Sequence, residues 1–425
     1  MSTAVSLLRR ICDELGLTVQ EELRASPHPV PLSSCLATSE LAWASVAAVA
    51  IAAGDSPAAL SSARIATAYR SDRFLTIDGT APSVWSPVSG FWRTNDGWVR
   101  THGNYPHHAA ALRAGLHLGS DADASLVRNS LEDRTTAEAI TGITAAGGLV
   151  VEVREENPAV DHAFREHPIV EITPTEQSLR TPRSLSGMRV LDLTRVIAGP
   201  VCTRTLALLG ADVLRIDPPS LPEPEWQHFD TGHGKRSALL DARSTRMREL
   251  LERADAVVLG YRPAALQRLG LTAELLREQY PALVVAELSA WGAAEPERAG
   301  FDSLVQAESG IAMIESPDGH SPGALPAQAL DHSAGYLLAA ALTSLLLRRT
   351  DNGRGGLVRV SLRRIAAELL GLPRLAEPQV YPDFEVGPHL QRFDVDGKTL
   401  VTARPALPLY EFAAPHLWGA DQPAW

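Results

Sequence analysis

The chain has few cysteines, and this scarcity limits the class of protein. Its 425 residues include only Cys12, Cys35 and Cys202, which are odd in number and far apart. They do not form the disulfide framework of a small secreted protein, and no Cys or His spacing typical of a metal site is present. The sequence therefore predicts a cytoplasmic protein without a metal cofactor.

The chain also lacks a clear membrane or secretion segment. Its first 16 residues have no apolar stretch with a small-residue cleavage site, and they favour a short amphipathic helix. The alanine-rich run 36–54 is the membrane candidate, but it contains Ser39, Glu40 and Ser45. It is also short for a span, which needs about 20 apolar residues. We expect a buried helix there and no membrane partner.

An excess of positive charge is absent as well. The net charge is −11, which argues against nucleic acid as a partner because a basic face would be required. Hydrophobic residues make up 45% of the chain and charged residues 21%, as in ordinary globular proteins. The length suffices for two or three domains with sizeable cores.

A strand–turn–helix–strand pattern is present between Leu185 and Asp217. Residues 188–193 favour a buried strand, Ala198-Gly199-Pro200 breaks it, and a helix at 203–209 leads to a strand at 213–216. Such a unit places the first turn at a helix N-terminus, where backbone N–H groups favour phosphates. The GxGxxG fingerprint of dinucleotide enzymes and the GxSxG elbow of α/β-hydrolases are missing. The pattern alone predicts no more than an α/β sheet protein.

The motifs from 184 to about 370 resemble, in order, those of the class III CoA-transferases. This family includes formyl-CoA transferase, carnitine CoA-transferase and the α-methylacyl-CoA racemases. The motifs are the stretch 185–217, Gly234-Lys235-Arg236-Ser237, Tyr261-Arg262-Pro263, Leu266 to Gly270, Gly300-Phe301-Asp302 and a helix from Asp331 to Arg349. The resemblance implies an α/β fold with a Rossmann-like parallel sheet and a smaller α+β domain. It also implies acyl-CoA and carboxylic acid substrates, and a homodimer of interlocked chains.

The first 180 residues resemble the small domain and closing segment of the family, which in family members follow the helix that begins near Asp331. We therefore predict permuted half-domains, with linkers at 26–32 and 177–186. The predicted units are an N-terminal helical segment 1–30, a small α+β region 31–180, a CoA domain 184–370, and a tail 371–425 that completes the small domain or acts as a linker. The alternative is an unrelated N-terminal domain with a chance turn motif.

Asp331 matches the aspartate that the family uses as a nucleophile at the start of a helix. In that chemistry the carboxylate attacks an acyl-CoA thioester, and an aspartyl-CoA thioester then passes CoA to a second acid. The helix start is expected to keep the carboxylate ionised. From the residue alone, a role as helix N-cap is the commonest alternative. The leading function is an acyl-CoA:carboxylate CoA-transferase.

Two other functions stay open. An acyl-CoA racemase or epimerase of this family has a histidine before the GxD aspartate, where this chain has Phe301. His332 is a poor substitute because neighbouring helix residues point about 100° apart. The second is a CoA-ester-binding protein without turnover, since several family positions are altered. Ile197 replaces a glutamine of formyl-CoA transferase, and with Phe301 it favours a non-polar acid.

For coenzyme A, the resemblance implies six contact residues, of which the apolar ones would lie beside pantetheine and the basic ones near phosphates. They are Arg195, Val196, Ala198, Lys235, Arg236 and Arg268. Taken singly, Lys235 and Arg236 also fit a solvated turn, and Arg268 a surface helix. Three further histidines have no partner at metal spacing and are interpreted as surface or small-domain residues. They are His102, His107 and His108.

Overall fold

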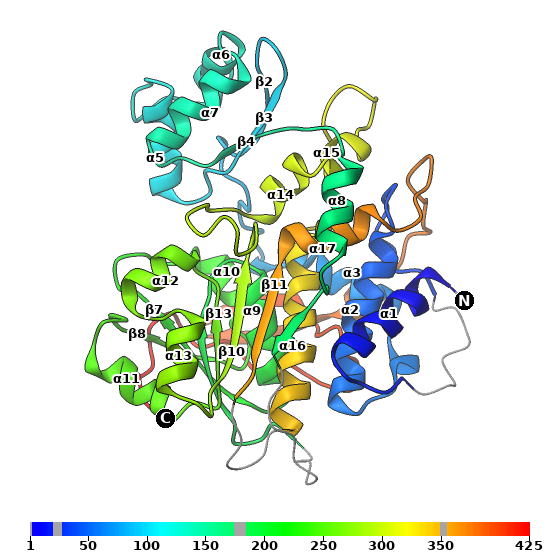
Figure 1. Ribbon diagram of the computed structural model, residues 1–425, viewed down its shortest axis with the longest axis vertical. Coiled ribbons are helices and arrows are strands. Elements are labelled where there is room, and N and C mark those ends of the chain that lie inside the picture. Colours follow the sequence, from blue (N-terminus) through cyan, green and yellow to red (C-terminus); the bar gives the residue numbers. More distant parts are fainter. Residues whose placement is uncertain (1, 20–27, 174–183, 349–354) are drawn as a thin grey trace.

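The protein is built around a seven-stranded sheet, seen in a computed structural model that describes residues 2–19, 28–173, 184–348 and 355–425 (Figure 1). The strand order is β5-β11-β10-β9-β6-β7-β8, and all neighbours are parallel except β5, which runs antiparallel to β11. The strands are β5 (Glu171–Thr173), β6 (Arg189–Leu193), β7 (Asp212–Asp217), β8 (Arg236–Leu239), β9 (Ala256–Leu259), β10 (Val284–Ser289) and β11 (Leu357–Ser361). Most of the two predicted linkers, at 26–27 and 177–183, lies outside the described residues.

The order of the six parallel strands determines where a ligand can bind. Numbered along the chain from β6, they follow the order 3-2-1-4-5-6, which is the doubly wound Rossmann arrangement. The winding direction reverses between β6 and β9, so the loops after these strands diverge and leave a crevice at their carboxyl ends. The predicted α/β fold with a Rossmann-like parallel sheet is therefore confirmed.

Helices cover both faces of this sheet. Successive strand residues point to opposite sides, so Val190 of β6 packs into one hydrophobic cluster and Leu191 into another. The first face is covered by α1 (Thr3–Glu14), α2 (Thr38–Ala53), α9 (Ala198–Leu208) and α16 (Ala329–Arg348). The second face is covered by α11 (Thr245–Glu252), α12 (Pro263–Leu269) and α13 (Ala273–Gln279).

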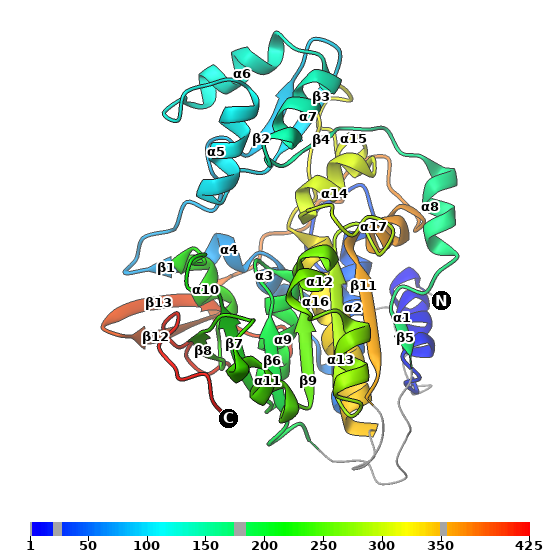
Figure 2. The ribbon, with the colours of Figure 1, turned by 60° about the vertical axis from the view of Figure 1, so that its left-hand side comes forward.

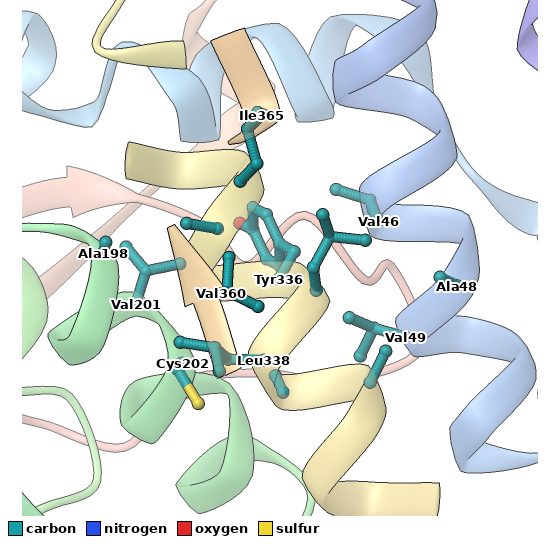
Figure 3. Packing of buried hydrophobic residues seen from close by; sticks show 14 of the residues in the cluster. Val46, Ala48, Val49, Ala198, Val201, Cys202, Tyr336, Leu338, Val360 and Ile365 are labelled. Carbon is teal, nitrogen blue, oxygen red and sulfur yellow. The ribbon is translucent and has the colours of Figure 1, made fainter. Parts of the chain in front are cut away.

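The core of the first face centres on α16, which packs between α2 and α9. Figure 3 shows Val49 of α2, Val201 of α9 and Leu338 of α16 in this cluster. Gly335 permits the close approach of α9, because a Cβ at this position would lie 2.6 Å from the carbonyl oxygen of Ala198. This contact fixes the start of α9 relative to the first turns of α16.

The apolar helices of this core have the composition of membrane spans but are buried. The run 36–54 forms the buried helix α2, as predicted, and α1 packs on it rather than standing apart. The helix α16 is long and apolar enough to cross a membrane, and 94% of its most apolar window is buried inside the protein. Both helices therefore serve the core of this fold.

Residues 84–153 form a small subdomain beyond one end of the main sheet (Figure 2). Its three antiparallel strands have the order β2-β3-β4, and three helices pack on them around a hydrophobic cluster of their own. The elements are β2 (Gly90–Arg93), β3 (Trp98–Thr101), β4 (Val150–Glu152), α5 (Pro106–Gly115), α6 (Ala124–Glu132) and α7 (Thr136–Ala145). A smaller α+β unit is thus present, within the region 31–180 predicted for it, while α2 and α3 of that region pack in the main core.

The C-terminal strands belong to a third sheet. It has the order β1 (Thr76–Ile77), β13 (Lys398–Ala403), β12 (Leu390–Val395), so the tail completes this sheet and not that of the small subdomain. Whether the half-domains are permuted stays a prediction. The remaining helices are α3 (Ser62–Tyr69), α4 (Ser71–Phe74), α8 (Pro158–Arg165), α10 (Glu225–Thr231), α14 (Asp302–Glu308), α15 (Ile311–Ile314), α17 (Leu362–Leu370) and the 3₁₀ turns η1 (Pro57–Ala59) and η2 (Gly387–His389).

Candidate active site

A crevice of about 460 Å³ opens at the carboxyl ends of β6, β9 and β10, where the strand order reverses. The loops after these strands form one wall, and the small subdomain supplies the other. Its principal lining residues are Tyr105, His107, His108, Leu149, Arg195, Val196, Ile197, Ala198, Tyr261, Arg262, Ser289, Phe301, Asp331 and Leu362. Doubly wound sheets bind ligands at this point, so the crevice is the candidate active site.

The turn after β6 brings the backbone to the crevice. Val196 has a φ of 72°, in the left-handed region that a β-branched residue rarely adopts. The helix α9 begins at Ala198, ahead of the predicted start at 203, because a proline is tolerated in the first turn of a helix and Pro200 lies there. Val196 and Ala198 both line the crevice, where the resemblance placed them.

Asp331 also lines the crevice, with 6% of its surface exposed. It is the third residue of α16 and therefore lies within the first turn, not at the N-cap. Its backbone N–H donates to Oδ2 of Asp302, at 2.9 Å. Asp302 is fully buried in the first turn of α14 and also accepts a hydrogen bond from the Gln306 side chain. The carboxylate of Asp302, from a separate motif, therefore lies directly against the backbone of Asp331.

The surroundings of these two acids disfavour charge on both. Burial, together with the nearby carboxylate of Asp302, holds the pKa of Asp331 well above its usual range. Burial also raises the pKa of Asp302 to about 6. A helix dipole favours a carboxylate by only about 0.3–1 kcal/mol, which is less than its desolvation costs in a buried site. Burial therefore opposes the ionisation of Asp331 that the helix start was expected to favour.

Two arginines line the crevice, Arg195 and Arg262. Arg195 is held in place, because its Nε donates to Oε2 of Glu223 at 2.9 Å and its guanidinium carbon lies 4.8 Å from the centroid of the Tyr105 ring. Arg262 is exposed, and its Nη1 donates to the carbonyl oxygen of Glu297 at 3.4 Å. Arg262 belongs to one of the motifs of the resemblance but not to the six predicted contact residues; its place in the loop after a strand end was the available signal.

Lys235 is not at the crevice, and this corrects the expectation of a phosphate contact. Its side chain is only 1% exposed. Its Nζ donates to Oδ2 of Asp192 at 2.9 Å, to the carbonyl oxygen of Pro200 at 3.0 Å and to Oγ1 of Thr203 at 2.6 Å. All three donor hydrogens are thereby used. Lys235 therefore links the start of α9 to β6 and stabilises the turn that lines the crevice.

Arg236 and Arg268 also lie away from the crevice, which corrects the same expectation for both. Arg236 forms an ion pair with Asp212 at 2.8 Å, and its guanidinium carbon lies 5.7 Å from the Trp425 ring centroid. Arg268 is an exposed residue of α12, 3.4 Å from a carboxylate oxygen of Glu297. Arg268 therefore has the surface-helix role that the sequence left open.

A smaller inner cavity of about 40 Å³ adjoins the crevice, and Asp331 lines both. Seven residues line the inner cavity but not the crevice and contribute polar or aromatic side chains: Asp72, Trp85, His102, Asn104, Trp226, Gln227 and Gln328. They come from the small subdomain, from the segment before it, from α10 and from the residue just before α16. Sequence analysis could not bring these segments together because they are far apart in the chain.

His102 is the functional candidate that sequence analysis missed. It is 4% exposed, and its ring stacks on Phe301 with 3.9 Å between the ring centroids. Burial lowers the pKa of His102 to about 3, so the ring is neutral, and its Nδ1 has no hydrogen-bond partner among the described residues. His102 does belong to the small subdomain, as one interpretation held, but it is buried within the site. His107 and His108 line the crevice.

Within the described ranges, no group of three or more His, Cys, Asp or Glu side chains is arranged to hold a metal ion. The three cysteines are free and buried.

The second half of the chain matches known proteins. Residues 185–381 match the family model described as CoA-transferase family III. The chain is 32% identical over 227 residues to a probable fatty acyl-CoA transferase, Rv3272, of Mycobacterium tuberculosis. This alignment covers 47% of this chain and 57% of that protein. It is 31% identical over 206 residues to formyl-CoA:oxalate CoA-transferase of Streptomyces coelicolor, with 44% and 50% covered. The chain thus spans about half the length of the curated relatives it matches.

A crystal structure of Rv3272 aligns with 45% of this chain and 57% of that chain, at 31% identity and a TM-score of 0.41. The similarity to this family rests on the sequence match and not on this superposition. The matched segment contains β6, β9, β10 and both acids of the Asp302–Asp331 pair. Over residues 185–381, the chain is similar to CoA-transferase family III.

Proposed function

We propose that the protein transfers CoA between carboxylic acids and that Asp331 is the nucleophile. The observation that carries this proposal is the position of Asp331: a buried carboxyl group of the family segment, lining the crevice at the point where the strand order reverses. Three buried, free cysteines fit the cytoplasm as its location. Because the chain resembles this family, we also propose that it forms a homodimer.

The proposed reaction proceeds by acyl transfer to Asp331. The ionised carboxylate attacks the thioester carbonyl, the C–S bond breaks, and a mixed anhydride and a CoA thiolate form. The thiolate then attacks the aspartyl carbonyl, which releases the first carboxylate and leaves an aspartyl-CoA thioester. A second carboxylate repeats these two steps in reverse order and leaves as the new acyl-CoA. Asp331 must lose its proton before the first step, since a neutral carboxylic acid is a poor nucleophile.

Residues around the crevice suit a CoA ester. The turn at Val196 and Ala198 offers backbone at the start of α9, and Arg195 and Arg262 supply positive charge near the opening. Arginine presents several N–H donors to a phosphate at once. The neutral interior near Phe301 and Leu362 is suited to the thioester end.

Mass spectrometry after incubation with acyl-CoA tests this proposal. We expect an acyl or CoA adduct on the peptide that contains Asp331, which hydroxylamine removes and which is absent in Asp331→Asn. Asp318→Asn is the matched control, because it neutralises a carboxylate outside both cavities. Unchanged transfer in Asp331→Asn would overturn the assignment. Tight binding of CoA esters without an adduct would favour a binding protein.

An acyl-CoA isomerase is the second candidate, and one observation favours it. The neutral ring of His102 stacks on Phe301. Phe301 occupies the sequence position at which the racemase branch of the family has its histidine. His102 lines the inner cavity together with Asp331, so a base and an acid flank the same space. In deuterated water, an isomerase exchanges the α-proton of the acyl group, and His102→Gln abolishes that exchange. An adduct at Asp331 without exchange would exclude this candidate.

A further inference from the structure

We propose that the inner cavity holds the acyl group during transfer and that it admits only a short, uncharged one. This inference rests on the proposed function, because it takes Asp331 as the residue that meets the thioester. Asp331 lies at the junction of the two cavities. A CoA ester that enters through the crevice therefore presents its carbonyl at Asp331 and its acyl chain to the inner cavity.

The size of the inner cavity limits the length of the acyl chain. Its volume is about 40 Å³, against about 460 Å³ for the crevice. A water molecule needs roughly 10–15 Å³ measured in this way, so the inner cavity holds about three water-sized groups. Two indole rings, Trp85 and Trp226, contribute to its walls. Acyl groups of about two to four carbons fit this space, and a longer chain does not.

The loop that carries Trp85 is held in place by hydrogen bonds to the side chain of Asn104. Oδ1 of Asn104 accepts from the Ser86 N–H at 3.0 Å and from the Ser89 hydroxyl at 2.7 Å. The side-chain nitrogen of Asn104 donates to the carbonyl oxygen of Val84 at 3.2 Å. These bonds hold the residues on both sides of Trp85. A shift of this loop that lengthens the cavity would break these bonds.

The charge of the lining excludes a second carboxylate on the acyl group. Asp72 and Asp331 line the inner cavity, and no lysine or arginine of the described part of the chain does. Arg100 stacks on Trp85 at 5.0 Å but does not reach the cavity. A buried carboxylate without a counter-ion costs several kcal/mol. The amides of Gln227 and Gln328 are neutral, so a hydroxyl group on the acyl chain is tolerated.

Transfer rates measured with propionyl-, hexanoyl-, dodecanoyl- and succinyl-CoA test the inference. In the unmodified protein we expect kcat/KM for hexanoyl-CoA and succinyl-CoA to lie at least about tenfold below that for propionyl-CoA, since a single methylene is worth about tenfold or more in a hydrophobic pocket. Trp85→Ala should raise kcat/KM for hexanoyl-CoA by about tenfold. Trp98→Ala, in the same subdomain but outside the cavity, should change neither value. Equal rates for short, long and charged donors in the unmodified protein would overturn the inference.

A second measurement separates this inference from the proposed function. If no donor forms an adduct at Asp331, the transferase proposal fails, and the cavity is then tested by binding alone. Titration of Asp331→Asn with propionyl-CoA and hexanoyl-CoA compares their Kd values, and we expect at least about fivefold weaker binding of the longer ester. If Trp85→Ala does not fold, Trp226→Phe replaces it and should reduce the difference between the two Kd values. Equal Kd values would overturn the inference independently of catalysis.

Discussion

The pair of Asp302 and Asp331 decides, at the scale of single residues, when the proposed nucleophile is charged. Asp302 accepts the backbone N–H of Asp331, and both carboxyl groups lie in a buried site. The second negative charge costs more than the first because the two groups share one desolvated space. Asp302 therefore acts as a positioning residue that also raises the pKa of its neighbour.

This arrangement predicts a pH dependence of transfer. Because the pKa of Asp331 is raised, the fraction of reactive carboxylate grows as pH increases, so kcat/KM for acyl-CoA should rise with pH through that raised pKa. Asp302→Asn removes the neighbouring charge but keeps an oxygen acceptor for the backbone N–H of Asp331. The rising limb should then move to lower pH in a pH–rate profile. The control Asp318→Asn should leave the limb in place, and an unmoved limb in Asp302→Asn would contradict the coupling.

Arg262 and Arg268 are expected to differ in their effect on the KM for acyl-CoA. Arg262 lines the crevice and Arg268, on the same stretch of chain, does not, although both approach Glu297. Arg262→Gln should raise the KM for acyl-CoA about fivefold, as expected for an exposed pairing with a phosphate worth about 1 kcal/mol. Arg268→Gln is the matched control and should stay within about twofold. The measurement is steady-state kinetics at low salt, where such pairing is strongest. Equal effects of the two changes would refute this placement.

The limits of prediction from sequence are clear at Lys235 and His102. A Gly-Lys-Arg-Ser turn gives no indication that the lysine turns inward, because its partner Asp192 lies 43 residues away. His102 likewise has no informative neighbour, since the ring it stacks on, Phe301, belongs to a distant segment. Asp331 was selected from its motif, and the structure places it at the crevice. Side chains whose roles depend on partners far along the chain were the ones that sequence reasoning misplaced or missed.

At the scale of elements, the contact between α9 and α16 links the core to the site. A Cβ on Gly335 would lie 2.6 Å from the Ala198 carbonyl oxygen and 2.8 Å from the Val201 Cβ. Gly335→Ala should therefore destabilise the protein by about 1–3 kcal/mol, even though alanine is the better helix former. Urea unfolding measures this loss of free energy. Gly387→Ala, whose Cβ would meet only a side-chain atom 3.8 Å away, is the control and should be nearly neutral.

The elements of the main sheet were predictable because parallel strands buried on both faces are continuous apolar runs. The strands predicted at 188–193 and 213–216 correspond to β6 and β7, within one residue at each end. The start of α9 was not predicted, since Ala198-Gly199-Pro200 has the composition of a turn. That start is fixed by tertiary contacts: the Nζ of Lys235 donates to the Pro200 carbonyl, and Gly199 fits closely against Thr194. Composition alone does not contain these contacts.

At the scale of the whole molecule, the small subdomain completes a site that the main sheet begins. It supplies Tyr105, His107 and Leu149 to the crevice and Trp85 and His102 to the inner cavity. The Arg154 N–H, just after β4, donates to the Ala307 carbonyl at 3.0 Å, so the subdomain is joined to α14, the helix that begins at Asp302. A mixed anhydride is destroyed by water, and the proposed chemistry therefore requires this second wall.

This requirement predicts that a bound ester steadies the subdomain. Hydrogen exchange of the Asp331→Asn variant, which cannot consume the ester, should show slower amide exchange in β3 and at the start of α5 when propionyl-CoA is added, because these segments lead into the two cavities. The edge strand β8 and helix α11 contribute no residue to either cavity and serve as the internal control. Protection confined to the loops after β6 and β9 would mean that the ester binds to the main sheet alone. The small subdomain would then not exclude water during transfer, and the size limit assigned to the inner cavity would lose its structural basis.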